Sequence, residues 1–130
     1  MTQRVLVDTD VLIDVFRQIE ATIAILQTAE ARASLGVSAV TQMELIVGCR
    51  NARELQNLDR FLQPFEVVSL SEGISKQAIA LLRQYRLSHG LLIPDSLIAA
   101  TALVTGYGLL TKNQSDYRFI EDLNLLPFSV

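Results

Sequence analysis

Acidic residues stand in four separate parts of the chain, at positions that favour a shared site. They are Asp8, Asp10, Glu44, Asp95 and Asp116. Clustered carboxylates repel one another, but a divalent cation relieves the repulsion, and Mg²⁺ prefers hard oxygen ligands of this kind. A Mg²⁺ ion held in this way activates water and stabilises the in-line transition state of phosphoryl transfer. If the fold brings these segments together, the residue types predict metal-assisted chemistry on a phosphate ester.

Taken alone, each acid also fits an ordinary structural role. Asp10 would cap a helix that begins directly after it, and Glu44 would close a capping box with the preceding Thr-Gln-Met. Asp95 would lie in the first turn of a helix, where the helix dipole favours an acid. Asp116 would lie in a solvated turn. Asp8 fits such a role least well, because it directly follows a buried strand. The joint placement of these acids, rather than any one of them, favours a site.

The spacing of apolar residues predicts the elements that must position these acids. Short apolar runs predict strands at 4–7, 35–38, 65–68 and 108–110, and a short fifth at 125–128 whose proline favours a sheet edge. Helical spacing predicts helices over 11–26, with a break or bend near 17–18, and over 41–49, 52–62, 74–87 and 96–105. This alternation is typical of a three-layer α/β/α sandwich with a mainly parallel sheet of four to five strands, here a single domain over residues 1–130. Ligand sites in such sheets form beyond the carboxyl ends of the strands, so the acids are expected at one edge.

Composition excludes several other classes of protein. The 130 residues carry 11 basic and 14 acidic groups, a net charge of −3, which argues against a basic protein that coats nucleic acid. A single cysteine, Cys49, and a single histidine, His89, exclude an internal disulfide, a cysteine-based zinc site and a multi-histidine metal site. Early acids interrupt any signal-peptide run, and the most apolar stretch, 91–110, is broken by Pro94, Asp95 and two glycines. A soluble, cytoplasmic protein is therefore expected.

Four motifs together resemble one known family. They are Val-Asp8-Thr-Asp10-Val-Leu-Ile, Thr41-Gln-Met-Glu44-Leu, Pro94-Asp95-Ser-Leu-Ile-Ala-Ala and Leu110-Thr-Lys-Asn113-Gln-Ser-Asp116-Tyr. In this order and spacing they resemble the PIN-domain family and, within it, the VapC-type toxins of bacterial toxin–antitoxin pairs. The resemblance runs over essentially the whole chain.

The resemblance implies a Mg²⁺-dependent endoribonuclease, with Mn²⁺ as the other candidate metal. The acidic quartet carried over by motif is Asp8, Glu44, Asp95 and Asp116, with Asp8 and Asp95 as the direct metal ligands. Thr9, Asp10 and Asn113 are expected to support the site. The chain departs from the family at two positions, because many relatives have Asn or Ser in place of Asp10, and often Phe in place of Tyr117.

The resemblance also implies partners. It implies a homodimer, an RNA substrate and a small antitoxin that wraps the toxin and blocks the site, often with a basic side chain among the carboxylates. The apolar pair Ile46-Val47 and the segment 52–62 are candidates for part of the antitoxin groove. Candidate contacts to RNA phosphates are Arg50, Arg53, Lys112 and Arg118. Without the four quartet acids, 10 acidic groups would face 11 basic ones, so the acidic excess is expected to lie in one pocket.

Two other readings of the first motif stay open from the sequence. Asp8-Thr-Asp10-Val resembles the nucleophile loop of haloacid-dehalogenase-like phosphatases, with Asp8 as nucleophile, but no later Gly-Asp-x-x-x-Asp motif follows. A non-enzymatic phosphoreceiver module would explain the paired acids and Thr111-Lys112. It would also need an acceptor aspartate after the third strand, where the chain reads Ser69-Leu-Ser71. A PIN-like domain that only binds a partner is the remaining alternative.

Overall fold

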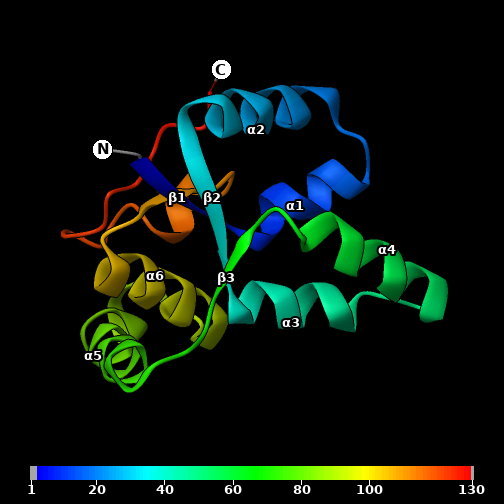
Figure 1. The fold of residues 1–130 in the computed structure, drawn as a ribbon. Helices are drawn as coiled ribbons and strands as arrows, with labels where there is room; N and C mark the ends of the chain where they lie inside the picture. The colour runs from blue at the N-terminus through cyan, green and yellow to red at the C-terminus, as the bar shows by residue number, and fades with distance from the viewer. Residues whose placement is uncertain (1–2, 130) are drawn as a thin grey trace.

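A computed structural model describes residues 3–129 and shows one parallel sheet (Figure 1). Within this range the strands are β1 (Gln3–Val7), β2 (Ala33–Ser38), β3 (Glu66–Val68) and β4 (Gly108–Leu110), and they lie in the order β3-β2-β1-β4. β1 is central, because Val5 pairs with Leu35 on one side and with Gly108 on the other. The first acidic motif therefore leaves the sheet from its middle.

The helices follow the strands in alternation. They are α1 (Thr9–Phe16), α2 (Glu20–Arg32), α3 (Ala39–Val47), α4 (Ala52–Leu62), α5 (Glu72–His89) and α6 (Ile93–Thr105), with a short 3-10 turn, η1, at Gln114–Asp116. Side chains of Asp8, Ser38, Asn51 and Ser71 accept hydrogen bonds from first-turn amides and so begin α1, α3, α4 and α5. A left-handed glycine, with φ of 71° and 76° respectively, ends α5 and α6.

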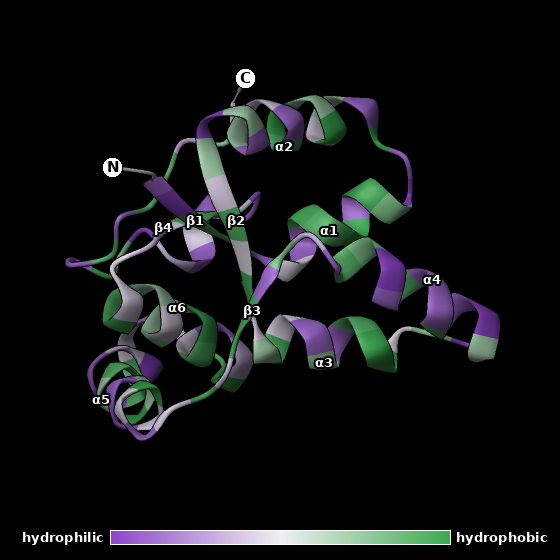
Figure 2. Ribbon diagram, in the orientation of Figure 1, coloured by the Kyte–Doolittle hydropathy of each residue, from purple (hydrophilic) through white to green (hydrophobic). Residues whose placement is uncertain are grey.

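Two apolar cores lie on opposite faces of the sheet. On one face α5, α6 and the segment after η1 pack around Leu6, Leu109 and Tyr117. On the other face α1, α2 and α4 pack around Val7 and Val37. Figure 2 shows the hydropathy of these helices: α1 and α6 are mostly hydrophobic, whereas α4 and α5 alternate between hydrophobic and hydrophilic residues. The three-layer α/β/α sandwich predicted from the sequence is confirmed.

The structure decides one open prediction and corrects two others. The segment near 17–18 joins two separate helices, α1 and α2, and Gln18 takes a left-handed φ of 58° there. The fifth strand is wrong for the described chain, where only an isolated bridge joins Leu109 and Leu125. The proline that follows Leu126 lacks an amide hydrogen and cannot extend the ladder. The helix around Glu44 begins earlier than expected, because Ser38 caps it.

The carboxyl ends of the parallel strands share one edge of the sheet, which is the lower edge in Figure 1. Asp8 follows β1 there, Ser38 leads from β2 into α3, and Thr111 follows β4. Within residues 3–129, no helix has both the length and the apolar composition needed to cross a membrane.

Candidate active site

Asp8 lies at the centre of the carboxyl edge and is buried, with 6% of its surface exposed. It ends β1 and caps α1, so the same residue joins sheet and helix. Its Oδ1 accepts a hydrogen bond of 2.8 Å from the Thr9 amide, and its Oδ2 accepts one of 2.8 Å from the Thr111 hydroxyl. Burial and, second, the nearby Asp10 charge raise the pKa of Asp8 to about 7, against the opposing effect of these hydrogen bonds.

Tyr117 connects Asp8 to Asp95. The Tyr117 hydroxyl donates to Asp95 Oδ1 at 3.2 Å, and its proximity lowers the pKa of Asp8. Burial and the two adjacent carboxylates raise the pKa of Tyr117 far above its ordinary value, so the hydroxyl keeps its proton. The two acids expected to bind metal therefore meet at one protonated hydroxyl group.

Asp95 shows that the remaining acids face the same site. It occupies the first turn of α6 and is half-buried. Burial is the largest cause that raises the pKa of Asp95. The charges of Asp116, Glu44 and Asp10 raise this pKa further, while the hydrogen bond from Tyr117 lowers it. The structure thus brings acids from four separate chain segments into one electrostatic neighbourhood.

Glu44 reaches the site through Thr9. The buried Thr9 hydroxyl donates to Glu44 Oε1 at 2.8 Å and lies 2.9 Å from the Thr41 hydroxyl. The capping box considered for Glu44 is wrong, because Ser38 caps α3 and Glu44 lies in the middle of the helix. The Glu44 side chain is exposed, and Thr9 holds one of its two oxygens.

Asp10 organises the turn that follows β4. Its Oδ2 accepts hydrogen bonds from the amides of Lys112, at 3.1 Å, and Asn113, at 2.9 Å. The helix-cap role considered for Asp10 is wrong, since α1 begins at Thr9 and Asp8 caps it. The Asp10 carboxylate therefore stabilises the turn after β4, next to the other acids.

This geometry gives a prediction for Asp10. Asp10→Ala should lower the free energy of unfolding by about 1–2 kcal/mol, because two amides lose their acceptor. Asp10→Asn keeps an acceptor oxygen and should retain most of the stability and the activity. Urea unfolding, with RNA cleavage assayed in parallel, checks both variants. An Asn variant with no activity would instead identify Asp10 as a metal ligand.

The other two predicted residues of the fourth motif lie at the rim. Asp116 ends η1 and is exposed, and it acts on Asp95 through its charge. Asn113 precedes η1 and contributes its backbone amide to Asp10. Sequence reasoning missed Thr111 as a site residue. The pairing of β1 with β4 was its signal, because it sets the residue after Leu110 beside the residue after Val7.

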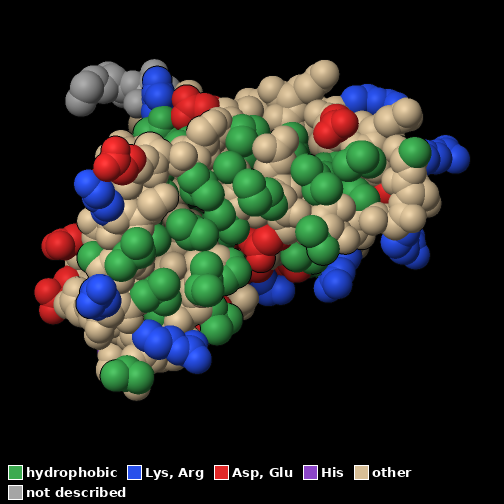
Figure 3. Space-filling model, turned by 90° about the horizontal axis from the view of Figure 1, so that it is seen from below, with side chains coloured by type: hydrophobic (Ala, Val, Ile, Leu, Met, Phe, Trp, Pro, Cys, Tyr) green, Lys and Arg blue, Asp and Glu red, His purple; other side chains and the backbone are tan. Residues whose placement is uncertain are grey.

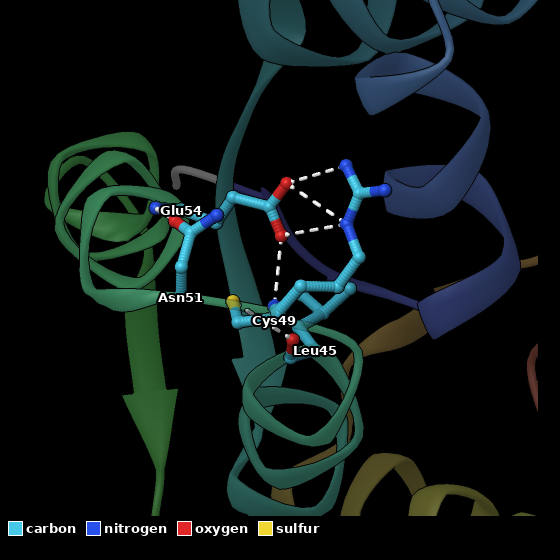
Figure 4. A network of polar contacts seen from close by, with 5 residues as sticks. Leu45, Cys49, Asn51 and Glu54 are labelled. Carbon is cyan, nitrogen blue, oxygen red and sulfur yellow. Dashed lines mark hydrogen bonds and ion pairs between the residues drawn. The ribbon is translucent and has the colours of Figure 1, made fainter.

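The basic residues considered for RNA contact fall into two groups. Arg50 is engaged at the junction of α3 and α4, where it pairs with Glu54 at 2.8 Å, and Asn51 caps α4 beside it (Figure 4). Lys112 is also engaged, through an ion pair of 3.0 Å with buried Asp14. Arg53 and Arg118 are exposed and make no ion pair within the described range. These last two are the better placed for an external anion.

The chemistry of the donors fits a magnesium ion bound by few protein ligands. Among residues 3–129 no three His, Cys, Asp or Glu side chains converge closely enough to form a metal-binding cluster. Mg²⁺, however, is usually held by one or two carboxylates and keeps several waters. Asp8 and Asp95 would be two such carboxylates, and the neighbouring acids would be acceptors for the waters. Cation binding would relieve the repulsion that raises both pKa values.

Comparison with known proteins identifies the family. The family model described as PIN domain matches residues 5–121. Ribonuclease VapC10 of Mycobacterium tuberculosis is 39% identical over 127 residues, covering 97% of this chain and 94% of that protein. Ribonuclease VapC1 of Methanocaldococcus jannaschii is 32% identical over 124 residues, covering 94% and 85%.

Solved structures agree with the fold. A chain of a toxin–antitoxin complex from Klebsiella pneumoniae superposes with a TM-score of 0.77 at 29% identity, covering 97% of this chain and 99% of that one. A chain of VapBC-1 from nontypeable Haemophilus influenzae superposes with a TM-score of 0.83 at 20% identity, covering 97% and 98%. Sequence, fold and the placement of the acids agree, and the chain belongs to the PIN domain family.

Proposed function

We propose that this protein is a metal-dependent endoribonuclease and the toxin of a VapBC-type pair. The observation that carries the proposal is that the Tyr117 hydroxyl binds Asp95 and lies near Asp8, while the charges of Glu44 and Asp116 act on Asp95. The ribonuclease names of relatives 39% and 32% identical to nearly the whole chain support the choice of RNA as substrate. The metal is Mg²⁺, with Mn²⁺ as an alternative, on the chemistry of the carboxylate donors.

Each acid has a distinct role in the proposed reaction. Asp8 and Asp95 would hold the cation, which would supply an activated water and neutralise charge on the phosphate. Glu44, fixed at one oxygen by Thr9, would accept a proton from the attacking water at its other oxygen, while the P–O bond to the leaving nucleoside breaks and solvent protonates the leaving oxygen. Asp116 completes the acidic rim, and Asp10 holds the 111–113 turn that delivers Thr111 to Asp8. Arg53 and Arg118 contact RNA phosphates outside the pocket.

Cleavage of RNA by the purified chain tests this proposal. With Mg²⁺ present, internal phosphodiester bonds of a mixed cellular RNA sample should be cut, and expression of the chain should arrest growth. An aspartyl-phosphate on Asp8 formed from a phosphate monoester, with intact RNA, would instead favour the phosphatase alternative. A chain that binds RNA or antitoxin without turnover would favour the binding-module alternative.

An antitoxin is the proposed protein partner, and an exposed apolar face marks where it binds. We define the α1/α3/α4 face by Ile13, Phe16, Met43, Ile46, Val47 and Leu55, which expose between 37% and 84% of their surface. Figure 3 looks at the carboxyl edge and shows hydrophobic side chains gathered over it, with acidic side chains among them near the middle. A segment seated on apolar residues can therefore extend a basic side chain to the acids. Neighbours such as the Klebsiella pneumoniae toxin–antitoxin complex support a partner of this kind.

Val47→Asp tests this face. Val47 exposes 84% of its surface, so the change should leave the free protein folded. An unpaired charge in an apolar interface should weaken antitoxin binding by at least about tenfold. Co-purification with the small protein encoded beside this chain measures the effect. Leu87→Asp is the matched control, because Leu87 is 99% exposed but lies on α5. Equal loss in both variants would contradict the assignment.

The proposal also covers the domain organisation, the oligomeric state and the cellular location. Residues 1–130 form a single domain, supported by two cores that share one sheet within the described range. The active form is a homodimer, which light scattering of the purified protein tests. The protein acts in the cytoplasm, where its RNA substrate is found.

A further inference from the structure

Tyr117 combines two roles, because its ring packs in the apolar core while its hydroxyl contacts the acidic site. The residue exposes only 1% of its surface, and the ring packs in the core formed with α5 and α6. Its backbone is fixed as well, since its amide donates to the Gln114 carbonyl at 3.1 Å and its carbonyl accepts from Ile120 at 3.0 Å. Phenylalanine would fill the same core equally well. The hydroxyl therefore calls for an explanation of its own.

The hydroxyl lies beside the acids of the site. It donates to Asp95 Oδ1 at 3.2 Å and also approaches Asp8. Asp8 has two other donors, the Thr9 amide and the Thr111 hydroxyl, at 2.8 Å each. For Asp95, within the part of the chain that the structure describes, the Tyr117 hydroxyl is the one side-chain donor. The rotation of the Asp95 carboxylate about its Cβ–Cγ bond is thus set by Tyr117, while that of Asp8 is set by the Thr9 amide and the Thr111 hydroxyl.

We propose that Tyr117 is a positioning residue that orients Asp95 toward Asp8 and so sets the affinity of the pair for a divalent cation. This inference rests on the proposed metal site and adds to it a determinant outside the four acids. A hydrogen bond at Oδ1 leaves Oδ2 available to a cation, and it holds that oxygen in one orientation. Partners of this kind, which orient a metal ligand without touching the metal, change metal affinity by about 10- to 100-fold when removed.

Tyr117→Phe removes this oxygen and leaves the ring in place. Isothermal titration calorimetry of the metal-free variant with Mn²⁺ should show an affinity for Mn²⁺ about tenfold weaker than that of the original protein. RNA cleavage should require correspondingly more metal, while the rate at saturating metal stays near that of the original protein. This separation distinguishes positioning from loss of structure, which would lower the saturated rate as well.

Tyr85→Phe is the matched control. Tyr85 is buried in the same core, with 8% of its surface exposed, and its ring packs edge-on to His89 and Phe119. Its variant should bind Mn²⁺ as the original protein does. Unchanged or tighter Mn²⁺ binding by Tyr117→Phe would overturn the inference and leave the proposed function standing. Failure of the original protein to bind Mn²⁺ at all would overturn both.

Discussion

Asp95→Asn should abolish RNA cleavage without weakening the fold. Asn matches the shape of Asp and can still accept the Tyr117 hydrogen bond, but it removes one of the two carboxylates proposed to hold the cation. We expect the cleavage rate to fall by more than about 100-fold, beyond the loss caused by removing a group that only orients a ligand. The measurement is cleavage of a labelled RNA in saturating Mg²⁺.

The stability of this variant should move in the opposite direction from its activity. Burial and the charges of Asp116, Glu44 and Asp10 all disfavour the ionised form of Asp95. Removing this charge relieves that penalty, so the free energy of unfolding in a chelator should be equal to or greater than that of the original protein. Urea unfolding in EDTA measures it. A less stable variant would show that Asp95 serves the fold.

Asp14→Asn is the matched control, because Asp14 is also a buried carboxylate but lies in the last turn of α1, at the end of the helix opposite Asp8. Its Oδ2 accepts from the Thr22 hydroxyl at 2.8 Å and pairs with Lys112 at 3.0 Å. These contacts lower the pKa of Asp14, the hydrogen bond from Thr22 most, so the charged form here stabilises the fold. The variant should lose about 1 kcal/mol of stability and keep RNA cleavage. Cleavage lost in Asp14→Asn but kept in Asp95→Asn would reverse the assignment of the site.

The placement of the acids at one sheet edge could be predicted from the sequence, because it depends on local pattern and topology. A continuous β-branched run predicts a buried strand, and alternation with helices predicts parallel neighbours. The carboxyl ends of those strands share an edge, so Asp8 and the start of α6 are brought together by topology alone. The observed order β3-β2-β1-β4 then puts Asp8 in the middle of the edge.

The role of each acid depends on contacts between distant segments, which local pattern does not contain. Thr41-Gln-Met-Glu44 matches a capping box, yet Glu44 bonds to Thr9, 35 residues away. Asp10 matches a helix cap, yet it binds amides that lie 102 and 103 residues away in sequence. In both cases a helix begins two residues before the pattern predicts, which frees the acid for a tertiary contact.

The contribution of the Tyr117 hydroxyl to the site was the least predictable from the sequence. Tyr117 reads from the sequence as a mild change from the phenylalanine frequent in the family. Its importance depends on η1, a single short turn that sets where the ring enters the core and where the hydroxyl emerges. A substitution that is minor for packing can thus be large for a site, since an oxygen added to a buried ring needs a partner.

Removal of divalent metal should abolish cleavage and also weaken the binding of RNA. Without a cation, the carboxylates of Asp8, Asp95 and their three acidic neighbours face the approaching phosphates and repel them. The net charge of −3 therefore reflects the site more than the surface, since four of the 14 acids belong to the proposed quartet. Bound metal reverses the sign of the local field, so RNA affinity should rise when Mg²⁺ is added.

A hydrolysis-resistant 2′-O-methyl RNA, whose phosphates keep both oxygens for Mg²⁺, allows binding to be measured apart from cleavage. In EDTA at pH 8, above the pKa of about 7 of Asp8, the double variant Asp8→Asn/Asp95→Asn should bind this RNA about tenfold more tightly than the original protein, because two repelling charges are gone. In Mg²⁺ the original protein should bind it more tightly than in EDTA, whereas the double variant should respond little. The difference should shrink at high salt, as expected for an electrostatic effect. Equal RNA affinity of the original protein with and without Mg²⁺ would contradict a metal bridge between the acids and the phosphate, and would place RNA recognition on the basic rim of Arg53 and Arg118 alone.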